Sequence, residues 1–313
     1  MNDSAQSILL LGDKGQLGSQ LQLLCNSAVV SSAEVKGAAL IKGSDRQFDI
    51  GDRDSALAIL NEVSPSVIIN AAAYTAVDQA EQEREQAFRV NADGPATLAQ
   101  WCSDNSATLI HISTDYVFAG DKPLYQGYSE DDTVAPVSVY GQSKLAGEQN
   151  IQSAMQQNYA ILRTAWLYGA QGKNFLKTML KLVCEKPGQT FKVVDDQYGS
   201  PTSTLALATQ IIKLLDTRDV NGGLQGIYHA TSAGHCSWYQ FACEFFALMQ
   251  IEHNLVPCSS DEYPTPASRP ANSILLNNRF ADLGIDSFMP WQDDLAQFVA
   301  EYGDQLLTTV QKN

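Results

Sequence analysis

Tyr140 and Lys144 are the two residues of this 313-residue chain whose types and spacing point most directly to chemistry. They lie four residues apart in a segment, residues 139–152, that we predict to be helical, and this spacing places both side chains on one helical face. An ammonium group beside a phenol favours the phenolate and lowers the pKa of the tyrosine. The pair therefore predicts a tyrosine that exchanges a proton near neutral pH, although Tyr-x-x-x-Lys also occurs in helices as an ordinary exposed pair.

The N-terminal part of the chain carries a glycine-rich turn of the type that binds a dinucleotide. Gly12, Gly15 and Gly18 follow an apolar run at residues 8–11 and precede a leucine-rich helical pattern. In such turns the first glycine permits a tight turn, the second lets the backbone approach a pyrophosphate, and the third lets helix and strand pack closely. The helix N-terminus offers free N–H groups to the phosphates. An ordinary strand–turn–helix connection is the alternative.

The elements that must position these residues alternate between strands and helices. Short apolar runs predict strands, and apolar residues at helical spacing predict helices. We predict strands at residues 8–11, 38–41, 67–70, 109–114 and 160–162, and helices at about 53–62, 81–105 (interrupted near Gly94-Pro95) and 139–152. This alternation predicts an α/β fold with a doubly wound, parallel, Rossmann-like sheet.

The C-terminal half departs from this regular alternation. After Arg163 the pattern loosens, and a cluster of prolines marks a loop-rich region. We predict that residues 1–165, together with about 190–235, form the dinucleotide-binding domain, and that residues 166–189 and 236–313 form a smaller substrate-binding lobe. Ligands in such folds lie at the carboxyl ends of the parallel strands, so we expect this lobe to cover the cofactor and hold the substrate.

Composition excludes several classes of partner. The net charge of −15 at pH 7 argues against nucleic acid or an anionic membrane surface. Residues 1–7 are polar and no apolar stretch is long enough to span a membrane, so we expect a cytoplasmic protein without a membrane partner. The six cysteines show no Cys-x-x-Cys pair and are expected to be reduced thiols.

Four motifs occur in the order typical of the extended short-chain dehydrogenase/reductases, which this chain resembles. They are the glycines of the N-terminal turn, the run 70–74 (Asn-Ala-Ala-Ala-Tyr), the run 113–116 (Ser-Thr-Asp-Tyr) and Tyr140-x-x-x-Lys144. Two later blocks, 196–202 (Asp-Gln-Tyr-Gly-Ser-Pro-Thr) and 265–270 (Thr-Pro-Ala-Ser-Arg-Pro), make the chain resemble the dTDP-4-dehydrorhamnose reductases more closely. The resemblance covers nearly the whole chain.

The resemblance implies an enzyme that reduces the 4-keto group of dTDP-4-dehydro-6-deoxy-L-mannose to give dTDP-L-rhamnose for cell-surface polysaccharide. The hydride would come from a reduced nicotinamide. Related dehydratases carry Thr-Asp-Glu where this chain has Thr114-Asp115-Tyr116, and the missing glutamate favours simple reduction over elimination. Reduction of another nucleotide keto sugar, and a non-catalytic dinucleotide-binding regulatory subunit, are the alternatives.

The resemblance gives three residues catalytic roles. Tyr140 would supply the proton to the new alkoxide, Lys144 would lower the tyrosine pKa and bind the nicotinamide ribose, and Thr114 would orient the substrate carbonyl. Without the resemblance, Thr114 is simply a β-branched strand residue. Asn91 has the place of a helix residue that shapes the fourth strand of the sheet.

The resemblance also implies a cofactor-binding set. It comprises the glycine turn, a pair expected to bind adenine, residues near the nicotinamide ribose, and the catalytic pair: Gly12, Gly15, Gln16, Leu17 and Gly18; Asp49 and Ile50; Ala71, Ala72 and Tyr74; Tyr140 and Lys144. Asp49 has a second interpretation as the cap of the next helix. Arg46, after the second strand, favours NADPH because an arginine suits the 2′-phosphate, with NADH as the alternative cofactor.

The predicted substrate-binding set spans both parts of the chain. The residues expected around the sugar and its base are Thr114, Asp115, Tyr116, Val77 and Trp166. Asn174 precedes an apolar helical run whose N-terminus would meet the diphosphate, and Arg269 would pair with a phosphate bidentately.

The expected partners begin with the small-molecule substrate, a dTDP-keto sugar. The resemblance also implies a homodimer and a Mg²⁺ ion held by acidic residues near the subunit interface. No acidic cluster in the sequence identifies the ligands of that ion, so we assign no metal-binding residue.

Overall fold

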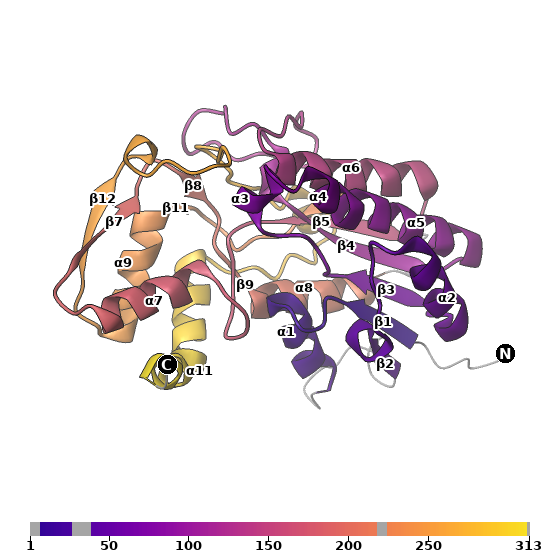
Figure 1. The fold of residues 1–313 in the computed structure, drawn as a ribbon, viewed down its shortest axis with the longest axis horizontal. Helices are drawn as coiled ribbons and strands as arrows, with labels where there is room; N and C mark the ends of the chain where they lie inside the picture. Colours follow the sequence, from indigo (N-terminus) through magenta and orange to yellow (C-terminus); the bar gives the residue numbers. More distant parts are fainter. Residues whose placement is uncertain (1–6, 27–38, 218–223, 312–313) are drawn as a thin grey trace.

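The structure of the protein is a computed structural model that describes residues 7–26, 39–217 and 224–311. Figure 1 shows a large lobe built around a sheet and, beside it, a second lobe that ends in the C-terminal helix. The strands are β1 (Ser7–Leu11), β2 (Ala39–Lys42), β3 (Val67–Asn70), β4 (Thr108–Thr114), β5 (Tyr159–Thr164), β6 (Leu167–Tyr168), β7 (Thr190–Val194), β8 (Tyr198–Gly199), β9 (Thr202–Ser203), β10 (Ile227–His229), β11 (Cys236–Ser237) and β12 (Asn254–Cys258). The α-helices are α1 (Gln16–Cys25), α2 (Arg53–Val63), α3 (Val77–Ala80), α4 (Arg84–Phe88), α5 (Gly94–Asn105), α6 (Val139–Ala154), α7 (Phe175–Glu185), α8 (Thr204–Leu215), α9 (Trp238–Met249), α10 (Asn278–Asp282) and α11 (Trp291–Gln311).

Six parallel strands form the central sheet, in the order β10-β5-β4-β3-β1-β2. The strand order reverses beside β1, which pairs with β2 on one side and with β3 on the other. Both faces of the sheet are covered, and this explains why β1 and β3 are nearly continuous apolar runs rather than alternating ones. The predicted α/β, Rossmann-like fold is confirmed. The carboxyl ends of β1, β3, β4 and β5 meet at one edge, beside the point where the order reverses.

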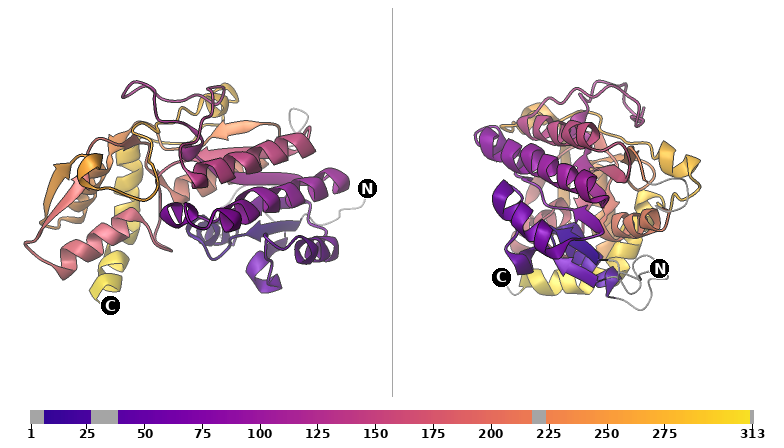
Figure 2. Two further views of the ribbon diagram at one scale, coloured as in Figure 1. Left: turned by 45° about the horizontal axis from the view of Figure 1, so that its top comes forward. Right: turned by 90° about the vertical axis from the view of Figure 1, so that its right-hand side faces the viewer.

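Helices cover both faces of this sheet (Figures 1 and 2). Helices α1 and α8 pack together on one face, where Ile8 and Leu10 of β1 point. Helices α2, α5 and α6 cover the other face and meet Leu9 and Leu11, because successive side chains of a strand point to opposite faces. Each fully buried leucine stabilises the fold by about 1.5–3 kcal/mol. Within the described ranges, none of the helices is long and apolar enough to cross a membrane.

The second lobe has its own core. Strands β7 and β12 pair in parallel, and α7, α9 and α11 pack beside them (Figure 1). Aromatic side chains fill much of this core, among them Phe241, Phe245 and Phe298. The lobe follows β5 in the chain and therefore lies next to the carboxyl edge of the central sheet.

The predicted division of the chain needs two corrections. Strand β7 was expected in the dinucleotide-binding domain, but it pairs with β12, and its Val193 lies in the core of the second lobe. Helix α10 was expected in the smaller lobe, but it packs on β10, and its Phe280 lies in the core beside α1 and α8. Both placements depend on contacts between distant segments, which local sequence patterns do not show.

The predicted helix at residues 81–105 is divided into α4, a π-helical turn (Arg89–Asp93) and α5. Asn91, within this turn, accepts a hydrogen bond from Tyr74 N at 2.9 Å and donates one to Ser143 Oγ at 3.0 Å. It therefore connects the segment after β3 to α6, rather than shaping the fourth strand as expected. Turns of this kind are frequent near functional sites.

Candidate active site

A cavity of about 690 Å³ lies at the carboxyl edge of the sheet. Its walls come from the segments after β1, β3, β4 and β5, from α6, and from the start of the second lobe. Most of the predicted site residues line it: Gly12, Gly15, Gln16, Leu17, Ala71, Ala72, Val77, Thr114, Asp115, Tyr116, Tyr140, Lys144 and Trp166. The structure thus brings the glycine turn and the predicted catalytic residues to one cavity.

The glycine turn has the geometry of a phosphate cradle. Gly12 has a φ of +74°, and a Cβ atom there would lie 2.6 Å from the carbonyl of Ala71, so only glycine fits. Gly18 does not line the cavity; a Cβ on it would collide with Gly12 O, which confirms its predicted role in close helix–strand packing. Helix α1 begins with Gly15 as its N-cap and no capping side chain, so its first N–H groups are available for an anion. These features fit the pyrophosphate of a dinucleotide.

Thr114 and Tyr140 meet at the inner wall of the cavity. Thr114 is the last residue of β4, and Tyr140 lies in the first turn of α6, which Ser138 caps by accepting a hydrogen bond from Gly141 N at 3.2 Å. Both side chains are buried, and the Thr114 hydroxyl lies close enough to Tyr140 to lower the pKa of its phenol. A Cβ on Gly141 would collide with Tyr116 O, so this glycine lets α6 approach the end of β4 closely enough for the two hydroxyls to meet.

The pKa of Tyr140 is not lowered by Lys144 as the sequence predicted. Burial raises the pKa of the phenol to about 12, and the neighbour that lowers it is the Thr114 hydroxyl. Lys144 Nζ points toward β4, where it donates a hydrogen bond to Ile112 O at 2.6 Å and lies 3.4 Å from His111 Nε2. Burial lowers the pKa of this lysine to about 8. Tyr140 therefore stays protonated at neutral pH, as a proton donor must.

Asp115 is a buried carboxylate at the wall of the same cavity. Its Oδ1 accepts a hydrogen bond from Thr114 Oγ1 at 2.9 Å, but its Oδ2 has no partner within hydrogen-bonding geometry. Burial raises the pKa of this carboxyl to about 6, against the opposing effect of the Ser273 and Thr114 hydroxyls. A buried polar atom without a partner costs stability, so its position beside the predicted catalytic residues is more typical of a binding site than of a structural core.

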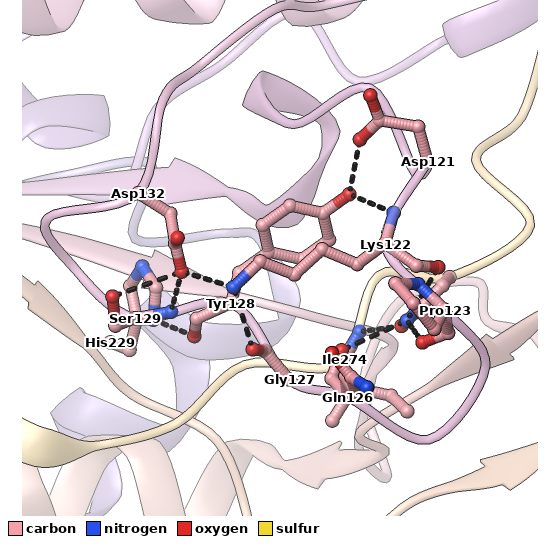
Figure 3. Close-up of polar contacts among 11 residues, drawn as sticks. Asp121, Lys122, Pro123, Gln126, Gly127, Tyr128, Ser129, Asp132, His229 and Ile274 are labelled. Atoms are coloured by element: carbon pink, nitrogen blue, oxygen red, sulfur yellow. Dashed lines mark hydrogen bonds and ion pairs between the residues drawn. The ribbon is translucent and has the colours of Figure 1, made fainter.

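The segment that joins β4 to α6, residues 115–138, is held by polar contacts (Figure 3). Lys122 Nζ forms an ion pair with Asp132 Oδ2 at 2.5 Å and lies over the Tyr128 ring. Tyr128 N donates a hydrogen bond to Ile274 O at 2.7 Å, which ties the segment to the C-terminal part of the chain. These contacts fix the connection between the strand that carries Thr114 and the helix that carries Tyr140.

A second cavity, of about 390 Å³, lies beside the glycine turn and is lined by Asp49 and Ile50, the pair expected to bind adenine. Asp49 Oδ1 accepts a hydrogen bond from Gly51 N at 2.8 Å. It does not cap α2, because Asp52 has that role and accepts a hydrogen bond from Ser55 N at 3.1 Å. The alternative interpretation of Asp49 as a helix cap is therefore wrong.

Arg46 does not reach this second cavity, so the argument that it favours NADPH is not supported by the structure. Its guanidinium pairs with Glu62 at 2.5 Å on the protein surface. Lys14 and Ser44 line the cavity instead. Ser44 is fixed there because its N and Oγ donate hydrogen bonds, at 3.0 and 2.5 Å, to the carboxylate of Asp13.

A third cavity, of about 560 Å³ and largely apolar, lies in the second lobe, between α7, β7 and α9. Trp238 lines both this cavity and the main one. Its indole stacks on that of Trp166, with ring centres 3.5 Å apart and planes 7° from parallel. Trp166 has a φ of +48°, a conformation that costs a non-glycine residue about 1 kcal/mol or more. Trp238 is therefore a wall that the two cavities share.

Tyr74 and Asn174 were predicted in the site but lie outside the main cavity. The Tyr74 hydroxyl donates a hydrogen bond to Glu83 Oε2 at 2.7 Å, away from the site. Asn174 caps α7 by accepting a hydrogen bond from Lys177 N, and its amide donates one to Gln16 Oε1 at 3.0 Å. It thus reaches the cavity only through Gln16, which joins the second lobe to the glycine turn.

The guanidinium of Arg269, predicted to pair with a phosphate, is already paired with a carboxylate. Its two Nη atoms donate hydrogen bonds to the carboxylate of Asp78, at 3.1 and 2.9 Å. Arg269 lines the third cavity, and its guanidinium lowers the pKa of Asp78. The carboxylate of Asp78 in α3 therefore takes the place in which a phosphate of the substrate was predicted to bind.

Several residues that line the main cavity were not in the predicted site set, among them Thr75, Lys173 and Trp238. Thr75 is one position beyond the predicted Tyr74, since the pattern did not show which residue of the segment faces inward. Lys173 stands between a glycine and the cap of α7, and a cation before a helix N-terminus is a recognisable signal for an anion. In the described part of the chain, no group of three or more His, Cys, Asp or Glu side chains can hold a metal ion.

Comparison with known proteins adds a consistent set of relatives. A family model described as RmlD substrate binding domain matches residues 6–303. A dTDP-4-dehydrorhamnose reductase from Mycolicibacterium smegmatis is 38% identical over 302 residues, covering 95% of this chain and 86% of the relative. A dTDP-4-keto-6-deoxy-D-glucose reductase from Streptomyces niveus is 36% identical over 293 residues, covering 92% and 95%. The crystal structure of dTDP-4-dehydrorhamnose reductase from Bacillus anthracis in complex with NADP has a TM-score of 0.86 and 37% identity, covering 95% of this chain and 99% of that one.

Proposed function

Because the chain belongs to the RmlD substrate binding domain family, we propose that it is an NADPH-dependent reductase that converts dTDP-4-dehydrorhamnose to dTDP-L-rhamnose. One observation carries this proposal: Thr114, Tyr140 and Lys144 line the same cavity as the glycine turn. A keto sugar in this cavity would meet hydroxyl donors beside the dinucleotide site.

The residues present fit a bound dinucleotide. The first turn of α1 and Gly12 suit the pyrophosphate, and the cavity lined by Asp49 and Ile50 suits the adenosine. Lys14 and Ser44 at that cavity would face the 2′-phosphate, and the NADP complex of the Bacillus anthracis relative supports NADPH over NADH. When bound, NADPH supplies the hydride.

Tyr140 and Thr114 would handle the carbonyl oxygen of the substrate. As the carbonyl is reduced, its oxygen gains negative charge, and the hydroxyls of Tyr140 and Thr114, which lie close together at the cavity, would both bind it. The O–H bond of Tyr140 breaks as the new alcohol O–H forms. An alkoxide is a stronger base than a phenolate, so a phenol with a pKa of about 12 still donates its proton. Lys144 lies one helical turn further along α6 and would hold the nicotinamide ribose.

The third cavity would hold the nucleotide part of the substrate. Its apolar lining suits a planar base, and Lys173 at the main cavity would face the diphosphate. The Streptomyces niveus relative is named for a different keto sugar, so reduction of another dTDP-keto sugar is the alternative. The homodimer and the Mg²⁺ ion implied by the resemblance are part of the proposal without a supporting contact in the structure.

Substrate preference tests the proposal. The protein, mixed with NADPH and either dTDP-4-dehydrorhamnose or dTDP-4-keto-6-deoxy-D-glucose, should consume NADPH faster with the first, and NMR should identify the product as dTDP-L-rhamnose. Faster consumption with the second sugar would assign the alternative reductase. Tight NADPH binding without consumption of either sugar would contradict the proposal and indicate a regulatory subunit.

A further inference from the structure

A chain of buried polar side chains runs from β3 through β4 to the predicted catalytic lysine. Asn70, His111 and Lys144 are each at most 2% exposed. Asn70 Nδ2 lies 3.0 Å from His111 Nδ1, and Lys144 Nζ lies 3.4 Å from His111 Nε2. Neither Asn70 nor His111 lines the main cavity, whereas Lys144 does, so His111 meets the site through the lysine.

The hydrogen-bonding pattern determines which nitrogen of His111 carries the hydrogen. Asn70 Oδ1 accepts a hydrogen bond from Ala72 N at 3.1 Å, so its Nδ2 is the group that faces the ring and donates to His111 Nδ1. Burial and the nearby Lys144 charge lower the pKa of His111 well below its ordinary value, so the ring is neutral. A neutral ring with Nδ1 as acceptor carries its hydrogen on Nε2, which faces Lys144 Nζ.

We propose that His111 is a positioning residue for Lys144: its Nε2–H, oriented by Asn70, faces the lysine nitrogen and disfavours the ammonium form. An ammonium group has only donors, so it cannot accept from Nε2–H, whereas the amine form can accept through its lone pair and still donate to Ile112 O. The lysine nitrogen is thereby held against β4 and is able to gain or lose a proton near neutral pH. The functional consequence rests on the proposed reductase activity, in which Lys144 holds the nicotinamide ribose.

Other side chains around Lys144 also bear on its protonation. Glu148, one turn further along α6, opposes the effect of burial and favours the ammonium. Tyr140 on the same helix and Asp115 after β4 line the same cavity as Lys144. From the π-helical turn that packs on α6, the side chain of Asn91 is neutral and bonds to Ser143. Among these neighbours, His111 is the one whose N–H can donate a hydrogen bond to the amine form of Lys144 but not to the ammonium form.

Two spectroscopic measurements test the proposal without substrate or cofactor, so its failure is separate from failure of the proposed function. Long-range ¹H–¹⁵N spectra of protein labelled at histidine should show His111 as the neutral Nε2–H form at pH 7.5. In protein labelled with ¹³C-lysine, the Cε resonance of Lys144, assigned with Lys144→Met, should titrate near pH 8. A charged ring, or the Nδ1–H form, would overturn the proposal.

Variants of His111 test whether the imidazole ring affects the titration of Lys144. His111→Gln places an amide oxygen where it can accept from the ammonium, so the Lys144 midpoint should rise by about one pH unit or more, a tenfold change. His111→Asn, which keeps a partner for Asn70 but removes the facing N–H, should raise it less. Thr108→Val, at the other end of β4, should leave it unchanged. An unchanged midpoint in either folded His111 variant would show that the ring has only a structural role.

Discussion

The cores of the two lobes differ in the buried polar groups that they contain. On the side of the central sheet that carries α6, aliphatic side chains surround ionisable residues, including His111, Lys144 and Arg163. The core of the second lobe is rich in aromatic rings, and its buried carboxylate, Asp294, accepts hydrogen bonds from Tyr168 and from Ser203. The large lobe therefore places charge at the carboxyl ends of its strands, whereas the second lobe provides an apolar shape.

Buried polar atoms that lack a hydrogen-bond partner also distinguish the two lobes. Within the described residues, the buried side-chain atoms without a hydrogen-bond partner belong to Asp115, Arg163, Thr164 and His229, all at or near the ends of β4, β5 and β10. Such atoms lower stability, and proteins tolerate them mainly where function requires them. From this comparison we infer that the large lobe carries the chemistry and that the second lobe contributes recognition.

The largest expected effect is on the proton donor of the large lobe. Tyr140→Phe removes the hydroxyl that would protonate the product, so the rate of NADPH oxidation should fall about 100-fold or more, while the NADPH dissociation constant changes little. Tyr116→Phe is the matched control, because its ring packs edge-on against Tyr140 at 5.6 Å in the same cavity. A near-parental rate for Tyr140→Phe, or an equal loss in both variants, would contradict the assignment.

A buried charge should matter more for stability in the large lobe than an aromatic ring does in the second lobe. Glu148 pairs with Arg163 at 2.7 Å, and both side chains are at most 3% exposed. Glu148→Gln would leave the arginine charge uncompensated and should lower the free energy of unfolding by about 3–5 kcal/mol, measured by urea titration. Phe245→Leu in the second core should cost about 1–2 kcal/mol. The opposite order would refute this part of the comparison.

Recognition by the second lobe should appear in KM rather than in kcat. Trp238→Ala removes the ring that stacks on Trp166 and forms a wall of both cavities, so KM for the nucleotide sugar should rise about tenfold, with a much smaller change in kcat. The NADPH dissociation constant should not change. Trp291→Phe, in the same core but away from the cavities, is the control. A fall in kcat without a change in KM would place Trp238 in the chemical step instead.

The smallest expected effect concerns the unsatisfied carboxylate. Because the pKa of Asp115 in the folded protein is about 6, above its ordinary value of 3.8, the folded state binds more protons than the unfolded state between these values, and stability falls as pH rises through this range. The free energy of unfolding of Asp115→Asn, relative to that of the parent, should therefore rise by about 1 kcal/mol as the pH is raised from 4.5 to 7.5. The difference in Tm between the two proteins should widen over the same range. A constant difference in Tm across this range would mean that the carboxyl is not perturbed.

Local patterns predicted the large lobe well because its elements are determined by their own residues. Apolar runs marked the strands to within a few residues, and glycine spacing marked the turn, since only glycine fits at Gly12 and Gly18. Tyr140 was found from its spacing to Lys144, whereas Thr114 was found through the family resemblance, because a threonine in a strand is not distinctive by itself.

The features that the sequence did not reveal depend on distant contacts or on burial. Arg269 pairs with Asp78, 191 positions away in the sequence. Strand β7 pairs with β12, whose partner residues lie 64 positions further along the chain. The pKa of Tyr140 required knowledge of its burial, which outweighs the neighbouring lysine. A spacing of four residues shows that two side chains share a helical face, but not which groups each of them meets.

Isotope transfer tests the central claim most directly. When NADPH carrying deuterium at the transferable C4 position is mixed with the protein and dTDP-4-dehydrorhamnose, one deuterium should appear at carbon 4 of the sugar in dTDP-L-rhamnose, and the Tyr140→Phe variant should reduce the rate of its appearance about 100-fold or more. Parental enzyme that binds NADPH but leaves the sugar without deuterium would contradict the account.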